Sequence, residues 1–457
     1  MNLSKSLRRL SALLACASAF LISMPAVGSP SVAPPLPLSA VDPYARPDSA
    51  LFVRLPGDML TRAQACYDLD ALMNALRQIH PDIFSAAGHE KIVRRYQDIR
   101  RGFPDTLSTA GFYQSVAPLV SMIGDPNTVL LSSAPQTTAP VDSLSDAPWT
   151  YYVDPVFHTA VMNFRNFSGT PRQMSHFCDS MFSALRIDGI SHLVIDVRGN
   201  TGSGDPQIAD VLLRYISPVP FIRIQKELVN RSPMVLALTA STDTLPSISF
   251  REVAQSDFIP PLTPAEGHFD GRVALITDSL TSSSAASLAW AFSHFCMGPV
   301  VGKETGGRNI CFGDTLTWYT PVGRIPCAIS HKRFWYPGAN EFDIHGTIPD
   351  IETLRSDDPI DYVWSALMGL VHEAIGNTEE FVTLQLLDTS HGALGRITDA
   401  VYHAPQGDTK VRILDSSDDE DGIHYKFFFD PNTSFNREIE FTLYIDGRKV
   451  HYYRPFR

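Results

Sequence analysis

Positive charge, metal-ligand spacings and long apolar segments are all scarce in this chain of 457 residues. Lysine and arginine number 37 against 49 aspartates and glutamates, so the formal net charge is −12. A nucleic-acid-binding surface needs a basic stripe interleaved with aromatic residues, and the sequence has none, so we expect no nucleic-acid partner. No cysteine or histidine spacing is typical of a metal site. We therefore expect neither a metal nor another cofactor.

Only the N-terminus carries a long apolar run. Residues 1–28 combine a basic start, an apolar run that ends at Met24 and small residues at 26–28, which is typical of a cleavable signal peptide. Residues 13–16 faintly resemble a lipoprotein box, but the apolar run continues past that cysteine. We expect cleavage after Gly28 and export to the periplasm or the medium. No later segment is apolar enough to span a bilayer.

Cysteine is also rare, and its count after the signal peptide is odd. Export permits disulfides, but at least one thiol must stay unpaired. Cys311 and Cys327 flank a predicted hairpin around residues 321–323, and whether they form a disulfide stays open. The five are Cys66, Cys178, Cys296, Cys311 and Cys327.

A glycine-spaced turn follows an apolar strand at residues 193–205. Asp205 suits a helix cap, Pro206 suits the first helical position, and apolar residues repeat on one helical face after them. Free backbone amides at such a helix entrance favour a phosphate, a carboxylate or the oxyanion of a tetrahedral intermediate. The alternative is that glycine merely turns the chain here.

A second strand, Val273–Thr277, leads into the serine-rich segment 282–287, which opens an apolar helix running through Phe292. Small residues around a serine let a substrate carbonyl approach, and the helix entrance supplies another amide donor. The alternative is a serine-rich helix cap beside a packed alanine face.

Together these segments resemble the tail-specific, or C-terminal-processing, serine peptidase family, which includes the tricorn core and interphotoreceptor-retinoid-binding repeats. Residues 198–202 resemble its Arg-Gly-Asn-x-Gly-Gly turn, with Ser203 replacing the last glycine. Ser284-Ala285-Ala286 resembles its Ser-Ala-Ala-Glu motif, with Ser287 in place of the glutamate. Residues 300–307 and 346–350 resemble the two motifs that follow. The similarity spans roughly residues 70–355.

The resemblance implies an α/β fold with a ClpP/crotonase-like core. Strands that alternate with helices from Leu193 to Ile351 independently favour a partly parallel sheet. After about residue 376 the pattern changes to strands, including Glu438–Ile445. The short interval between Asn127 and Leu193 leaves little room for the PDZ domain of many family members. We expect a signal peptide at 1–28, a linker at 29–60, a helical lead-in at 61–132, the catalytic core at 149–375 and a small β-sandwich-like domain at 376–457.

The family's active site would map onto named residues of this chain. Ser284 would be the nucleophile, the amides of Gly202, Ser203 and Ala285 would hold the oxyanion, and Asp343 would be the orienting acid. The position of the family's general-base histidine is Asn127, which follows Asp125 by two residues. An amide cannot accept the serine proton at any accessible pH.

Another residue could supply the base. The other branch of the family uses a lysine where this chain has Arg308, whose guanidinium stays protonated. Lys303 falls on a commonly variable position. His345 and His331 would reach the serine only if their loop folds inward, and this alternative stays open. The acidic run at 415–421 lacks calcium-site spacing and is expected to be a solvated loop.

Two functions therefore remain. The first is a serine endopeptidase that acts on protein or peptide substrates through Ser284. The second is a catalytically inactive peptidase-like protein that binds peptides. Loss of the triad histidine costs on the order of a million-fold in kcat, so the choice depends on whether another base reaches Ser284. The sequence does not predict the oligomeric state.

Overall fold

The structure is a computed structural model, and the predicted signal peptide and most of the predicted linker lie outside the residues it describes. The described residues are 52–53, 55–131, 147–154, 158–241, 247–254, 257–342, 345–353, 358–368, 370–377, 382–389, 392, 395–404, 407–429, 438–445 and 447–455. No helix in these ranges is both long enough and apolar enough to cross a membrane.

The lead-in is helical and has its own apolar core. Thr61 caps its first helix reciprocally: the Thr61 hydroxyl accepts from the Gln64 N–H, and the Gln64 side chain accepts from the Thr61 N–H. Apolar residues three or four apart, such as Leu69, Leu72 and Leu76, are buried on one face of that helix. The elements are β1 (Met59–Thr61), α2 (Arg62–Ile79), α3 (His89–Gly102), β2 (Thr106–Ser108) and α4 (Thr109–Ser121).

The central layer is a six-stranded sheet with the order β13-β10-β9-β6-β5-β4, in which only β4 runs antiparallel to its neighbour. This arrangement confirms the α/β class. The strands are β4 (Trp149–Asp154), β5 (Thr159–Phe164), β6 (His192–Asp196), β9 (Arg272–Thr277), β10 (Val300–Gly302) and β13 (Ile351–Glu352).

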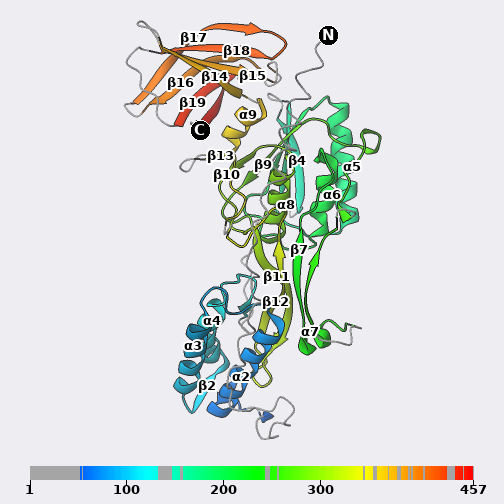
Figure 1. Cartoon of the computed structure of the whole chain (residues 1–457), viewed down its shortest axis with the longest axis vertical. Helices are drawn as coiled ribbons and strands as arrows, with labels where there is room; N and C mark the ends of the chain where they lie inside the picture. The colour runs from blue at the N-terminus through cyan, green and yellow to red at the C-terminus, as the bar shows by residue number, and fades with distance from the viewer. Residues whose placement is uncertain are drawn as a thin grey trace, which may run out of the picture. The chain divides into compact units, whose positions relative to one another are not determined.

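Alternate side chains of this sheet enter two different cores, which explains why its strands are apolar throughout. Leu193 and Ile195 face a core with α5 (Pro171–Ile187), α6 (Gln207–Ile216) and α8 (Ser283–His294). Figure 1 labels these three helices near strands β4 and β9. Val194 and Ile276 face a core with α9 (Ile360–Met368) and the C-terminal strands.

A second, antiparallel sheet joins the lead-in to the central layer. Its order is β11-β12-β7-β8, and the short β3 (Val129–Leu130) also pairs with β12. The turn of the β11–β12 hairpin meets α2, where the Asp68 carboxylate accepts from the N–H groups of Val322 and Gly323 at 2.8 and 2.7 Å. The other elements are β7 (Lys226–Arg231), α7 (Pro233–Leu238), β8 (Ser247–Glu252), the 3-10 turn Pro264–Glu266, β11 (Ile310–Tyr319) and β12 (Pro326–Trp335).

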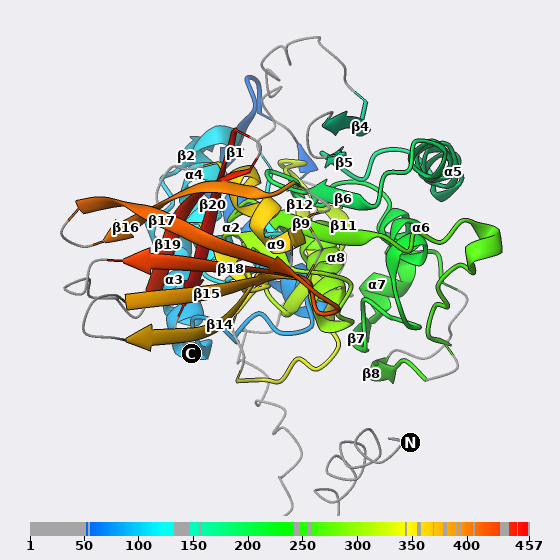
Figure 2. The same cartoon turned by 90° about the horizontal axis from the view of Figure 1, so that it is seen from above.

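The C-terminal part is a seven-stranded antiparallel sheet with the order β14-β15-β18-β17-β16-β19-β20 (Figure 2). Buried and half-buried residues alternate along β18, so one face of that strand belongs to the core. The strands are β14 (Leu370–Asn377), β15 (Val382–Asp388), β16 (Ile397–Ala404), β17 (Gly407–Asp418), β18 (Ile423–Phe429), β19 (Glu438–Ile445) and β20 (Arg448–Pro455).

The structure corrects one expectation in this part and resolves another. Residues 415–418 continue β17 and pair with β18 instead of forming a solvated loop, because the strand ladder extends across the acidic run. All five cysteines after the signal peptide are free thiols. Cys311 lies opposite Phe334 and Cys327 opposite Trp318 in the β11–β12 hairpin, so these two thiols do not pair.

Candidate active site

The glycine-spaced turn after β6 is held by the buried side chain of Asn200. Its Nδ2 donates to the Phe164 carbonyl at 2.9 Å, and its Oδ1 accepts from the Gly202 N–H at 2.9 Å. Gly199 and Gly202 both have φ near +70°, in the left-handed region that favours glycine. The turn therefore depends on glycine for its backbone path and on one amide side chain for its support.

This turn packs directly on the start of α8. A Cβ on Gly202 would lie 2.3 Å from the Ser284 nitrogen and 2.6 Å from the Ser282 carbonyl oxygen, so no side chain fits there. The Ser282 N–H also donates to the Asn200 carbonyl at 3.1 Å. The two segments singled out by sequence, although about 80 residues apart, thus form one site.

Ser284 lies in the first turn of α8 and is half-buried. The preceding Ser283 has φ +50°, a strained conformation for a residue other than glycine. On the other side of the helix start, a Cβ on Gly307 would lie 2.4 Å from the Ala286 Cβ, so the segment at 306–307 closes tightly over the serine-rich turn. No described residue forms a hydrogen bond with the Ser284 hydroxyl.

The three predicted oxyanion donors differ in whether their backbone N–H groups have a hydrogen-bond acceptor in the structure. The Gly202 N–H donates to Asn200 Oδ1, and the Ala285 N–H donates to the Ser282 carbonyl at 3.1 Å. The Ser203 N–H has no acceptor among the described residues. Ser203 is thus the most open donor of the three.

Asn127 stands where the family histidine is expected, and its side chain is already engaged. Its Nδ2 donates to the Phe312 carbonyl at 2.8 Å, and its backbone N–H donates to Asp125 Oδ1 at 3.0 Å. Two further contacts connect Cys311, which precedes Phe312 in β11, to the start of α8. The Cys311 sulfur lies 3.5 Å from the Tyr336 hydroxyl, which donates to the Ser283 carbonyl at 3.4 Å.

Asp125 is a buried hub beside Asn127. Its Oδ2 accepts from the hydroxyls of Thr128 and Ser330, each at 2.6 Å, and lies 3.4 Å from His80 Nε2. Burial raises the pKa of Asp125, but the hydrogen bonds from His80, Ser330 and Thr128 outweigh burial and hold the pKa below its ordinary value. His80 Nδ1 accepts from the Asp82 N–H at 3.1 Å, and the buried Nε2 of the same ring faces the Asp125 carboxylate.

The other residues weighed as bases are engaged elsewhere, and Asp343 lies outside the described residues. The His331 ring contacts the Asp314 carbonyl through Nδ1, and burial lowers the pKa of His331. His345 Nδ1 lies 3.2 Å from Glu304 Oε1. The backbone of Arg308 forms an isolated antiparallel β-bridge with Gly346, the residue after His345.

Some groups near Ser284 had no signal in the sequence. Tyr336 is buried, and burial raises its pKa well above the ordinary value, so it stays a neutral donor to Ser283. Arg223 reaches Ser287 below the helix start. Both contacts join residues more than 50 positions apart, which no local pattern predicts.

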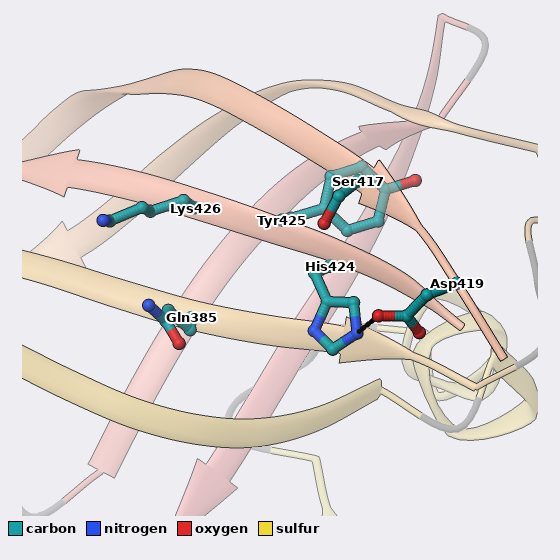
Figure 3. A pocket seen from close by; sticks show the side chains of 6 residues that line it. All are labelled: Gln385, Ser417, Asp419, His424, Tyr425 and Lys426. Carbon is teal, nitrogen blue, oxygen red and sulfur yellow. Dashed lines mark ion pairs between the residues drawn. The ribbon is translucent and has the colours of Figure 1, made fainter. Parts of the chain in front are cut away.

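A polar hollow of about 280 Å³ also lies on the C-terminal sheet (Figure 3). His424 and Asp419 form an ion pair at 3.0 Å within it, while Asp418 pairs with Arg396 at 3.3 Å nearby. No group of His, Cys, Asp and Glu in the described ranges could hold a metal ion. The hollow is lined by Gln385, Ser417, Asp419, His424, Tyr425 and Lys426.

Comparison with known proteins places the turn, α8 and the loop at 304–307 in one segment. Residues 158–353 match the model of Peptidase family S41. Three solved structures are similar: a lipoprotein from Streptococcus agalactiae (14% identity, 69% of this chain and 98% of the other, TM-score 0.44), a photosystem II D1 C-terminal processing protease (12%, 63% and 93%, 0.40) and the tricorn protease (18%, 46% and 17%, 0.28). No curated protein matches the chain.

Proposed function

We propose that this chain, whose residues 158–353 match the model of Peptidase family S41, is a serine-type endopeptidase acting on protein or peptide substrates through Ser284. The observation that carries this proposal is the contact of Gly202 with the Ser284 backbone. It sets a turn that presents amides against the serine of a helix start, which is the arrangement that acyl transfer needs.

The chemistry would proceed by an acyl-enzyme. The Ser284 Oγ forms a bond to the substrate carbonyl carbon, the open Ser203 amide donates to the oxygen that becomes negative, and the C–N bond then breaks. The serine proton must reach the leaving amine, and water later releases the acyl group. Asn127 cannot carry that proton, so hydrolysis is slow in this proposal.

The engagement of Asn127 favours a second candidate function. Because the Asn127 amide donates to the Phe312 carbonyl, the site keeps the contact between the turn and Ser284 but gains no base from position 127. The chain would then bind peptides without cleaving them. Equal retention of one fluorescent peptide by the parent and by Ser284→Ala, with no cleavage by either, would support this function over the first.

Restoring an imidazole tests the proposal directly. We expect Asn127→His to raise kcat/KM for a quenched casein-like substrate by on the order of a thousandfold or more, because it restores a proton acceptor at the position where the family resemblance expects the base. Asn127→His combined with Ser284→Ala is the control and should be inactive. A parent that is already fast, and is unchanged or slowed by Asn127→His, would mean that another residue supplies the base.

Export is part of the same proposal, since the substrate would be met outside the cytoplasm. We propose that the N-terminal segment is removed after Gly28. Mass spectrometry of the protein recovered from the periplasm or medium should find a chain that begins near Ser29. Recovery of an intact Met1, or of a lipid on Cys16, would contradict it.

A further inference from the structure

We infer that Arg223 and Ser287 form a positioning relay that holds the backbone of Ser284 in register with the oxyanion turn, an inference that rests on the proposed function. Neither residue would touch substrate. Both act through the first turn of α8, from the side of the helix that is buried in the core.

The relay is a continuous chain of short hydrogen bonds. Arg223 Nη1 donates to the Ser287 hydroxyl at 2.9 Å, and that hydroxyl donates to the Ser284 carbonyl at 2.8 Å. Arg223 is itself clamped by Asp210, whose two carboxylate oxygens accept at 2.6 and 2.8 Å. The residues Asp210, Arg223, Ser287 and Ser284 are thus linked in that order.

The direction of each bond in this chain is fixed by chemistry. A guanidinium only donates, so the Ser287 oxygen must accept from Arg223. The hydroxyl has a single hydrogen, which is then directed to the Ser284 carbonyl. Because Ser287 is 3% exposed, no bulk water competes for that hydrogen. Two successive hydrogen bonds therefore connect the Arg223 cation to the Ser284 peptide group and set the orientation of that group.

The far end of the relay lies on the helix that the oxyanion turn opens. Asp210 is in the first turn of α6, five residues after Asp205, where the glycine turn ends. The nucleophile helix α8 and the turn that supplies the amides are consequently tied together twice. Gly202 and Ser284 touch directly, and the relay braces α6 against α8 from below.

The charges of Arg223 and Asp210 suit a fixed structural role better than proton transfer. The Arg223 side chain is 9% exposed and Asp210 is 23% exposed, so their charges offset one another in a largely dry place. A bidentate pair has one preferred geometry, which a lysine could not reproduce.

A double-mutant cycle tests the relay. We would measure the rate at which a fluorophosphonate labels Ser284 in Ser287→Ala, Arg223→Met and the double variant, in both the parent and the Asn127→His background. Each single change should slow labelling by about 10- to 100-fold, the scale expected when a reacting group is displaced by less than 1 Å. The double variant should be no slower than the slower single one, because the two residues act through each other.

Further readouts separate positioning from simple loss of stability. Peptide KM and the pH midpoint of labelling should stay unchanged, since the relay neither binds substrate nor carries the proton. Arg100→Met is the matched control, because Arg100 makes a bidentate pair with Asp70 in the lead-in. It should lower Tm and leave the labelling rate unchanged.

The outcomes distinguish the two proposals. Labelling that is unaffected by Ser287→Ala, or effects of the two single changes that simply multiply, would overturn the relay and leave the peptidase proposal standing. An absence of labelling in both backgrounds would overturn the proposed function, and the relay's role would fall with it.

Discussion

The two halves of the candidate site are held together by different means. The half around Gly202 and Ser284 is built from backbone: a turn with positive φ angles, a helix start and close contacts that exclude side chains. The half around Asn127 is built from side chains, with Asp125 at its centre. Backbone geometry survives substitution at neighbouring positions, whereas one side-chain replacement removes a proton acceptor. The comparison teaches that the two halves of the candidate site are sensitive to different kinds of substitution.

The largest effect is expected when a methyl group, the smallest side chain, is added to the backbone half of the site. Gly202→Ala places a methyl group 2.3 Å from the Ser284 nitrogen, at φ +74°. We expect a loss of about 2 to 4 kcal/mol in the free energy of unfolding, from overpacking and backbone strain together. Urea denaturation measures the loss, and fluorophosphonate labelling of Ser284 should fall by at least about tenfold.

Gly189→Ala is the matched control for that change. Gly189 has a similar φ of +68°, but a Cβ there meets nothing within 4 Å, so only backbone strain of about 1 kcal/mol is expected. Equal losses for the two variants would mean that the contact with Ser284 does not govern the turn.

The side-chain half should show its dependence on Asp125 as a function of pH. Since hydrogen bonds hold the pKa of Asp125 below its ordinary value of 3.8, the carboxylate stabilises the fold above that pH. The contribution is lost as the pH falls through the lower, folded-state pKa. At pH 7 we expect Asp125→Asn to lower the free energy of unfolding by about 3 kcal/mol, the scale for breaking a buried charged network.

Urea unfolding of the parent and Asp125→Asn at pH 7, 4, 3 and 2 measures this difference. The gap between the two proteins should shrink below pH 4. A gap that stays constant down to pH 2 would show that the charge of Asp125 is not what stabilises the lead-in.

The smallest effect is expected at Asn127 itself. Asn127→Ala removes one hydrogen bond to the Phe312 carbonyl, which we expect to cost about 1 kcal/mol of stability. The labelling rate of Ser284 should change by less than about threefold, because an amide takes no proton in the reaction. A large fall in labelling, with Tm nearly unchanged, would instead assign Asn127 a direct part in the site.

Much of the fold follows from local pattern. The alternation of strands and helices after Leu193 predicts the partly parallel sheet that the structure shows, and β19 has the bounds predicted for it, Glu438–Ile445. The helix after the glycine turn begins at Gln207, whose N–H donates to Asp205 Oδ1 at 2.9 Å, close to the predicted cap. These features depend on neighbouring residues, so sequence periodicity is sufficient.

Only part of the candidate site can be predicted from local sequence pattern. Motifs point to the turn and to Ser284 because their spacing is local. Arg223 and Ser287 are 64 positions apart, and Tyr336 and Ser283 are 53 apart, so both contacts depend on how distant parts of the chain pack together. Their residue types are common on protein surfaces, and nothing in the adjoining sequence distinguishes them. Tertiary register decides these contacts.

The shared core beneath the central sheet bears on where this protein could be shortened. Val161, Val194, Ala274, Ile276 and Val301 are at most 2% exposed and lie in one cluster with side chains of α9 and the C-terminal strands. A chain that stopped near residue 375 would keep α9 on the central sheet but lose β20, which packs on α9, and would expose the apolar side chains of α9 to water. Contiguous apolar patches of this kind drive self-association. The C-terminal strands therefore cover an apolar face of α9, and we expect a chain truncated there to self-associate.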